Sequence, residues 1–325
     1  MLQQRVITAI ILASLVTLAV FQLPVEFISL LFGLVTLLAA WEWSYLIGIN
    51  EPSKRYFFLL ALVVPMLWVQ FWTQFLEASQ YLIETGQQAI YQNAKKSGWS
   101  SVSNFMETLD IKDIRYYSGA LEYLVIPPVI FWVIVMFLIK RSPAGILKMA
   151  LTTGQKKWLG GFVLVLAWMF FVRLRVLFGP EMTMYLLILV WAADISAYFV
   201  GKKYGKSKLS PEISPGKTIA GFYGALLSAV LCGIVLSLIY AFPLMNASDM
   251  ILLSVLTVLI SVYGDLFFSV VKRQSGVKES GSILPGHGGI LDRIDSMIAA
   301  VPVFYAGIYL MYMLIENAQK AGAIE

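Results

Sequence analysis

The stretch from Val6 to Val25 reads VITAIILASLVTLAVFQLPV and contains no Asp, Glu, Lys or Arg. At a rise of about 1.5 Å per residue, an α-helix of this length crosses a hydrocarbon layer about 30 Å thick. The sequence therefore predicts a membrane-spanning helix. A cleaved signal peptide is the competing interpretation, but no small-residue cleavage site follows and another apolar run begins at once.

The composition of the whole chain is also typical of a membrane protein. Of 325 residues, 59% are hydrophobic and 13% are charged, and the mean hydropathy is +0.78. A soluble domain carries about 25% charged residues, so a soluble globular protein is excluded. One cysteine rules out an intramolecular disulfide, and one histidine rules out a histidine-rich metal site. The net charge is +5, but basic residues in a membrane protein report on orientation, so we expect no nucleic acid partner.

Further apolar runs predict an all-α polytopic membrane protein with about nine transmembrane helices. The other predicted spans are residues 25–49, 56–76, 121–139, 157–177, 182–201, 219–241, 250–271 and 294–315. With the N-terminus in the cytoplasm, 17 Lys and Arg residues fall on the cytoplasmic side and 5 on the other side. Basic residues concentrate in cytoplasmic loops, so we predict a cytoplasmic N-terminus and a C-terminus outside.

The sequence divides into three parts. Residues 1–76 hold the first three transmembrane helices, residues 77–120 form an extracytoplasmic insertion, and residues 121–325 form a C-terminal transmembrane region. Within the insertion, Gln87–Tyr91 would suit a short amphipathic helix on the membrane surface, although a solvated loop with some helix is the simpler interpretation. The C-terminal region carries two polar loops, 202–218 and 272–293, on the cytoplasmic face.

Asp194 and Asp265 are acidic residues that lie inside predicted spans. A carboxylate there costs about 2.5–3.5 kcal/mol on insertion scales, so each needs a metal ion or a basic partner. Either is a candidate functional residue, and a structural ion pair between helices is the alternative. Glu42, between two tryptophans, is a weaker candidate because a side chain near a helix end can reach the interface.

The two polar loops combine cations, hydroxyl groups and glycines. The first contains Lys202 and ends in Ser214-Pro215-Gly216-Lys217-Thr218, directly before a predicted helix. The second contains the glycine-rich run Pro285–Gly289, which would let backbone amides approach a phosphate, although ordinary turns also use such glycines. His287 in this run would either contact a phosphate or complete a turn. Carboxylates, lysines and amides together handle phosphates and divalent metals, and the lack of a Walker motif argues against a P-loop NTPase.

The second loop resembles the signature of the phosphatidate cytidylyltransferases, also called CDP-diacylglycerol synthases. The matching residues are Ser269, Lys272-Arg273, Lys278, Gly281, Leu284-Pro285, His287-Gly288-Gly289 and Asp292-Arg293-Ile294-Asp295. The resemblance extends to Ser214–Thr218, to the stretch with Asp194, Tyr198 and Gly201-Lys202, and to Ala40–Trp43. It covers most of the chain outside the 77–120 insertion.

This resemblance implies a nucleotidyltransferase that converts CTP and phosphatidate, or a related lipid phosphate, to CDP-diacylglycerol and pyrophosphate. It implies a multi-pass protein of the bacterial cytoplasmic (inner) membrane with its active site facing the cytoplasm, and leaves a homodimer open. Asp265 and Asp292 would hold Mg2+ and a second cation, K+ being one candidate. The implied catalytic residues are Asp265, Asp292, Lys272, Arg273 and Lys217, and the implied substrate-binding residues are Ser214, Thr218, Lys278, Gly286, His287, Gly288, Gly289, Arg293, Asp194 and Lys202.

The chain departs from the family pattern at six positions, which are Ile195, Ser196, Ile219, Ala220, Phe268 and Glu279. Loss of polar groups from the pocket leaves two alternatives open. One is a paralogous CTP-dependent enzyme that acts on a different lipid phosphate, and the other is a catalytically inactive membrane scaffold. A transporter is the rival from another class, but no internal repeat is visible and the polar loops lie on one face.

Overall fold

The computed structural model describes residues 2–109, 114–283 and 288–320, with side chains for 12–107, 109, 119–283 and 288–320. Within these ranges the regular secondary structure is helical except for one short hairpin, which the all-α prediction omits. The elements are α1 (Leu2–Gln22), α2 (Val25–Leu46), α3 (Pro52–Gln70), α4 (Trp72–Lys96), α5 (Ser100–Thr108), the 3-10 helix η1 (Ile114–Val125), α6 (Ile126–Arg141), α7 (Pro143–Lys148), α8 (Thr153–Tyr204), β1 (Lys208–Ser210), β2 (Ser214–Thr218), α9 (Ile219–Ile239), α10 (Leu244–Gln274) and α11 (Leu291–Lys320).

Seven helices of the described chain are long and apolar enough to cross a membrane. They are α2, α3, the run Gly119–Arg141 that ends in α6, and α8 to α11. The chain is therefore a helical, multi-pass membrane protein, as predicted. The predicted number of nine spans is not settled by this count, because α8 contains two predicted spans and α1 contributes only a shorter apolar segment, Leu12–Gln22.

The predicted spans 157–177 and 182–201 correspond to the two helical halves of α8, which meet at a kink. At the kink, Gly179 has φ 80° and ψ 178°, and Pro180 follows it. Proline cannot donate a hydrogen bond to the preceding turn, and its ring displaces a carbonyl there. The kink thus falls in the gap that the sequence places between the two spans.

Replacement of Gly179 by alanine is expected to destabilise the protein by about 1–3 kcal/mol, because these backbone angles are essentially restricted to glycine. The thermal unfolding midpoint in detergent measures the effect. Gly154→Ala is the matched control, since it lies in the first turn of the same helix and its new Cβ would come no closer than 3.9 Å to Thr152 Oγ1. Equal midpoints for the two variants would contradict the assigned kink.

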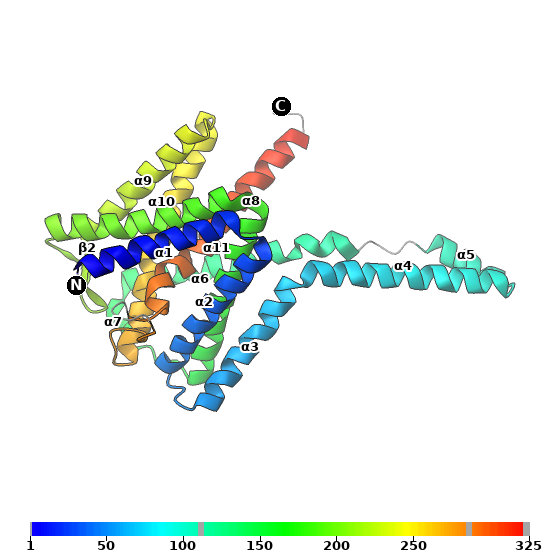
Figure 1. The fold of residues 1–325 in the computed structure, drawn as a ribbon, viewed down its shortest axis with the longest axis horizontal. Coiled ribbons are helices and arrows are strands. Elements are labelled where there is room, and N and C mark those ends of the chain that lie inside the picture. The colour runs from blue at the N-terminus through cyan, green and yellow to red at the C-terminus, as the bar shows by residue number, and fades with distance from the viewer. Residues whose placement is uncertain (1, 110–113, 284–287, 321–325) are drawn as a thin grey trace. The chain divides into compact units, whose positions relative to one another are not determined.

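The chain forms two compact units, Met1–Leu62 with Val125–Glu325, and Val63–Leu124. In the first unit α8 packs against α2, α9 and α11, and α10 packs against α6, α9 and α11 (Figure 1). The largest buried side chains of this core are aromatic, and they include Trp43, Trp132, Phe170 and Tyr305. This packing brings α8, α10 and α11, which carry the intramembrane acids, into one bundle.

The second unit is mostly helical. The long helix α4 packs against α5, and Gln87 Nε2 donates to the carbonyl oxygens of Met106 at 3.2 Å and Leu109 at 3.0 Å. The segment Gln87–Tyr91 lies inside the 25-residue α4. The segment is helical, and its helix is longer than the short one expected. Its location on the membrane surface stays a prediction. The boundaries at residues 76 and 120 stay a prediction.

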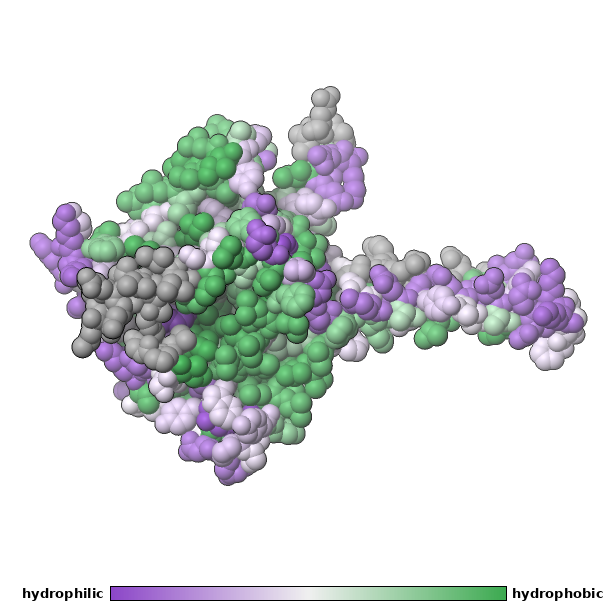
Figure 2. Space-filling model, in the orientation of Figure 1, coloured by the Kyte–Doolittle hydropathy of each residue, from purple (hydrophilic) through white to green (hydrophobic). Residues whose placement is uncertain are grey.

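The surface of the first unit is largely apolar on the face drawn in Figure 2. Helices α1 and α2 expose Leu15, Leu18, Phe27 and Leu30, the last with 70% of its surface accessible. A soluble monomer rarely exposes contiguous apolar surface of this extent. Contact with lipid chains accounts for it.

Candidate active site

A cavity of about 750 Å³ lies where α8, the β1–β2 hairpin, α9, α10 and α11 meet. Five lysines, one arginine and five carboxylates line it, although it lies within an apolar helix bundle. These charged residues are Lys202, Lys208, Lys217, Lys272, Lys278, Arg293, Asp194, Asp265, Glu279, Asp292 and Asp295. Such a cavity suits a ligand that carries several charges, because its mixed lining can neutralise anions and hold cations.

The first ion pair in the cavity joins the hairpin to α10. Lys217 at the end of β2 places Nζ 2.7 Å from Asp265 Oδ2, and the same Nζ donates to the Val262 carbonyl at 3.2 Å. Ser269, one turn further along α10, donates from Oγ to Asp265 Oδ1 at 3.3 Å. Asp265 thus has the basic partner that an intramembrane carboxylate requires.

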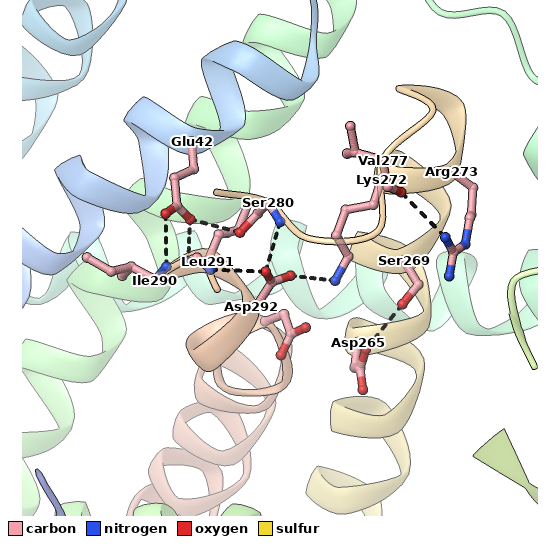
Figure 3. A network of polar contacts seen from close by, with 12 residues as sticks. Glu42, Asp265, Ser269, Lys272, Arg273, Val277, Ser280, Ile290, Leu291 and Asp292 are labelled. Carbon is pink, nitrogen blue, oxygen red and sulfur yellow. Dashed lines mark hydrogen bonds and ion pairs between the residues drawn. The ribbon is translucent and has the colours of Figure 1, made fainter. Parts of the chain in front are cut away.

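The second ion pair joins α10 to α11 (Figure 3). Lys272 Nζ lies 2.6 Å from Asp292 Oδ1, and the two side chains are only 11% and 13% exposed. The other oxygen of Asp292, Oδ2, accepts from the backbone N–H of Ser280 at 2.8 Å and of Gly289 at 3.3 Å. Asp292 is therefore fixed by one cation and two amides, all from the signature loop and the helix before it.

Nine of the predicted site residues line the cavity. They are Asp194, Lys202, Lys217, Thr218, Asp265, Lys272, Lys278, Asp292 and Arg293. Thr218 also caps α9, since its Oγ1 accepts from the N–H of Gly221 at 3.1 Å. The structure thus brings together the two loops that are separated by the whole of α9 and α10.

The remaining predicted residues lie elsewhere. Within the described part of the chain, Ser214, Arg273, Gly288 and Gly289 are not among the residues that line the cavity. Gly286 and His287 lie outside the described residues. Gly288 has a positive φ of 81°, and Gly289 contributes its amide to Asp292. Their predicted contact with substrate phosphate stays a prediction.

Arg273 contacts backbone in both loops. Its Nε donates to the Ile213 carbonyl of the hairpin at 3.3 Å, and one terminal nitrogen donates to the Val277 carbonyl at 3.5 Å. The guanidinium therefore ties the hairpin to the end of α10. Its predicted direct role in catalysis remains a prediction, and this position supports an organising role instead.

Glu42 is more closely connected to the site than its sequence context predicts. This side chain does not reach towards a membrane interface, because it is only 3% exposed and accepts hydrogen bonds from the signature loop. Asp295 is also buried against the cavity, and its Oδ1 accepts from the N–H of Ser296 at 2.8 Å. The sequence signal for Glu42 is a carboxylate between two tryptophans in an apolar helix. Its hydrogen-bond partners lie 238–249 residues further along the chain, so the sequence does not show them.

Known proteins resemble this chain over almost its whole length. Residues 3–311 match the sequence model of the cytidylyltransferase family. The chain belongs to this family. Of its relatives, the phosphatidate cytidylyltransferase of Haemophilus influenzae is 35% identical over 308 residues, covering 94% of this chain and 97% of the relative. That of Pseudomonas aeruginosa is 32% identical over 309 residues, covering 94% and 96%, and that of Bacillus subtilis is 43% identical over 141 residues, covering 42% and 51%.

The match confirms the resemblance predicted from the signature loop, and this cytidylyltransferase is a nucleotidyltransferase. Five of its six departures from the usual family pattern, Ile195, Ser196, Ile219, Ala220 and Phe268, are absent from the described lining of the cavity. Phe268 instead packs in the core, edge-on to Trp43 at 5.9 Å between ring centroids. Only Glu279 faces the cavity. The departures therefore remove little from the pocket itself.

The cavity of this cytidylyltransferase has the donor type that Mg2+ prefers. Carboxylate oxygens from α8, α10 and α11 line it, and hard oxygen ligands suit this ion. In the described ranges, no group of three or more Asp, Glu, His or Cys side chains is arranged so that it could hold a metal ion. Magnesium commonly binds through one or two carboxylates together with substrate phosphates, so the donor set fits an ion that arrives with a nucleotide.

Gly289→Ala is expected to impair this cytidylyltransferase by crowding the loop. A Cβ at residue 289 would collide with Ser280 Oγ and Glu42 Oε2, two atoms that hydrogen-bond to each other. Overpacking of this kind costs about 1–3 kcal/mol, and here it would displace the amide that reaches Asp292. Unfolding midpoint and turnover should both fall, whereas Gly86→Ala, where a Cβ meets open space, should change neither. Full activity in the Gly289 variant would contradict the loop geometry.

Proposed function

We propose that this cytidylyltransferase converts CTP and phosphatidate to CDP-diacylglycerol and pyrophosphate. The observation that carries the proposal is the charged cavity inside an apolar bundle, where Lys217 pairs with Asp265 and Lys272 pairs with Asp292. The relatives that match over almost the whole chain carry the name phosphatidate cytidylyltransferase, which supports the same reaction.

The membrane setting follows from the substrates. Phosphatidate keeps its acyl chains in lipid, while CTP comes from water, so the site must lie at the boundary between the two. The proposed topology has nine crossings, a cytoplasmic N-terminus and a cytoplasmic cavity in a bacterial inner membrane. The excess of 17 over 5 basic residues on the side of the polar loops supports this orientation.

The proposed reaction is an in-line displacement at phosphorus. A phosphate oxygen of phosphatidate attacks the α-phosphorus of CTP, and a new P–O bond forms to the lipid phosphate. The bond from the α-phosphorus to the oxygen that bridges to the β-phosphate breaks, and pyrophosphate leaves with that electron pair. The nucleophile is already an anion at neutral pH, so the reaction needs no strong general base.

Charge repulsion is the main barrier that the protein must lower. Two anionic substrates enter one site, and fixed positive charges that lie ready before the reaction stabilise them without reorganisation. Lys217 and Lys272 would exchange their carboxylate partners for phosphate oxygens, with Lys202, Lys278 and Arg293 nearby on the cavity wall. Asp265 and Asp292, freed of their lysines, would then hold Mg2+ and a second cation.

When bound, Mg2+ would supply a Lewis acid that neutralises charge on the nucleotide phosphates and the leaving pyrophosphate. The residues of the chain orient the reactants around it. The Ser280 and Gly289 amides keep Asp292 in place, and Ser269 does the same for Asp265.

A panel of lipid acceptors tests the proposal. The purified full chain in detergent micelles receives CTP, Mg2+ and either phosphatidate, lysophosphatidate or a long-chain alcohol phosphate, and the CDP-lipid is measured. We expect phosphatidate to have the highest kcat/KM. A higher value for another lipid phosphate would establish the paralogous enzyme, and no CDP-lipid from any acceptor by the folded protein would favour the inactive scaffold.

A further inference from the structure

Glu42 on α2 reaches across the bundle to the start of α11. Its Oε1 accepts from the N–H of Ile290 at 3.0 Å, and its Oε2 accepts from the N–H of Leu291 at 2.9 Å. The first amides of a helix have no partner within the helix, so a carboxylate from elsewhere can satisfy them and interact favourably with the helix dipole. Glu42 thus caps the helix that carries Asp292.

The same carboxylate holds the other side of the signature loop. Ser280 donates from Oγ to Glu42 Oε2 at 2.8 Å, while its backbone N–H donates to Asp292 Oδ2 at 2.8 Å (Figure 3). Ser280 therefore connects Glu42 directly to the carboxylate of the Lys272–Asp292 pair. Glu42 itself is not among the residues that line the cavity in the described part of the chain.

Two glycines of the loop leave room for Glu42. A Cβ on Gly281 would lie 2.5 Å from Glu42 Oε1, and a Cβ on Gly289 would collide with Oε2. The carboxylate is enclosed, with 3% of the residue exposed, and an ionised carboxylate can only accept hydrogen bonds. The signature loop and the start of α11 thus pack closely around the carboxylate that α2 contributes.

We propose that Glu42 is a positioning residue of the active site, which holds Asp292 in its working geometry by fastening Ser280 and the start of α11 to α2. The inference rests on the proposed function for its kinetic consequence, but its structural part does not. Glu42→Gln replaces one acceptor oxygen with an NH2 group that faces backbone N–H donors. Because the loop amides lose part of their anchor, Asp292 loses its fixed position.

The kinetic test compares Glu42→Gln with Glu26→Gln, an exposed glutamate in the first turn of the same helix. We expect Glu42→Gln to lower kcat for CDP-lipid formation by about 10–100-fold, the range typical of residues that orient a ligating group. The KM for CTP should change by less than about threefold, because the lysines proposed to bind its phosphates are all still present. Glu42→Asp, which keeps the charge on a shorter stem, should recover part of the lost kcat.

A structural test needs no activity. Hydrogen exchange of peptides that cover residues 288–292 should accelerate in Glu42→Gln, while exchange within α8 stays as in the unchanged protein. If Glu42→Gln fails to fold, Ser280→Ala removes the same link from the other side and should show the same pattern of kcat loss. Acceleration throughout the bundle, or an unchanged kcat with slow exchange at residues 288–292, would overturn the proposal.

The two proposals fail in different ways. If the unchanged protein forms no CDP-lipid, the proposed function is wrong, and the exchange experiment alone judges the role of Glu42 in holding the loop. If the unchanged protein is active and Glu42→Gln and Ser280→Ala retain its kcat, only the positioning role is wrong. A double variant whose kcat loss is close to that of either single variant would support one shared pathway through Asp292.

Discussion

Replacing Asp292 by asparagine is expected to lower kcat/KM for CDP-lipid formation by about 1000-fold. The change keeps the shape of the side chain but removes the charge that Lys272 pairs with at 2.6 Å and that would hold a cation against the nucleotide. It also turns Oδ2, which accepts from two backbone amides, into an NH2 group in one of the two side-chain orientations. The measurement is turnover of CTP and phosphatidate by purified protein in micelles.

The matched control for this variant is Asp249→Asn. Asp249 is an exposed residue near the start of α10, remote in sequence from the cavity-lining part of that helix. It should retain the full kcat/KM, and both variants should elute as folded protein in gel filtration. A folded Asp292→Asn enzyme within about threefold of the unchanged protein would show that this carboxylate takes no part in the chemistry.

Lys217→Met is expected to lower kcat/KM by about 100-fold and to destabilise the protein by about 1–3 kcal/mol. The catalytic loss arises because a fixed positive charge leaves the site where two anions must meet. The stability loss has a separate cause, since Asp265 remains inside the bundle without the ammonium group that lies 2.7 Å away. Turnover and the thermal unfolding midpoint measure the two effects.

A double variant separates these two effects. Lys217→Met combined with Asp265→Asn removes both charges, so the unfolding midpoint should return towards that of the unchanged protein while activity stays low. Lys206→Met is the control, because Lys206 is an exposed lysine of the same loop that does not line the described cavity. Restored turnover in the double variant would mean that Lys217 acts only by neutralising the charge of Asp265.

The sequence predicted the parts of the fold that depend on local patterns. Long apolar runs identified the helices of the bundle, and the gap between residues 177 and 182 coincides with the kink at Gly179-Pro180. The two spans predicted on either side of this gap correspond to the two halves of α8. The hairpin β1–β2 was missed, since its five-residue second strand contains proline and glycine, which are rare in strands.

The candidate site was predictable to the extent that its residues belong to the two polar loops. Lys217, Asp265, Lys272 and Asp292 lie in one cavity as the signature resemblance implies. Sequence could not show which lysine pairs with which carboxylate, because that depends on how α9 folds back between the loops. Glu42 was undervalued for the same reason, since its three donors come from residues 280, 290 and 291.

Following the two ends of the CTP triphosphate separately tests the proposed displacement at phosphorus. The purified chain receives phosphatidate, Mg2+ and CTP labelled at either the α- or the γ-phosphate, and label is measured in the lipid and in pyrophosphate. We expect α-label in the lipid, γ-label in pyrophosphate, equal amounts of both products, and loss of both in Asp292→Asn. Transfer of the γ-label to lipid, or no release of pyrophosphate by folded protein, would contradict the proposed displacement.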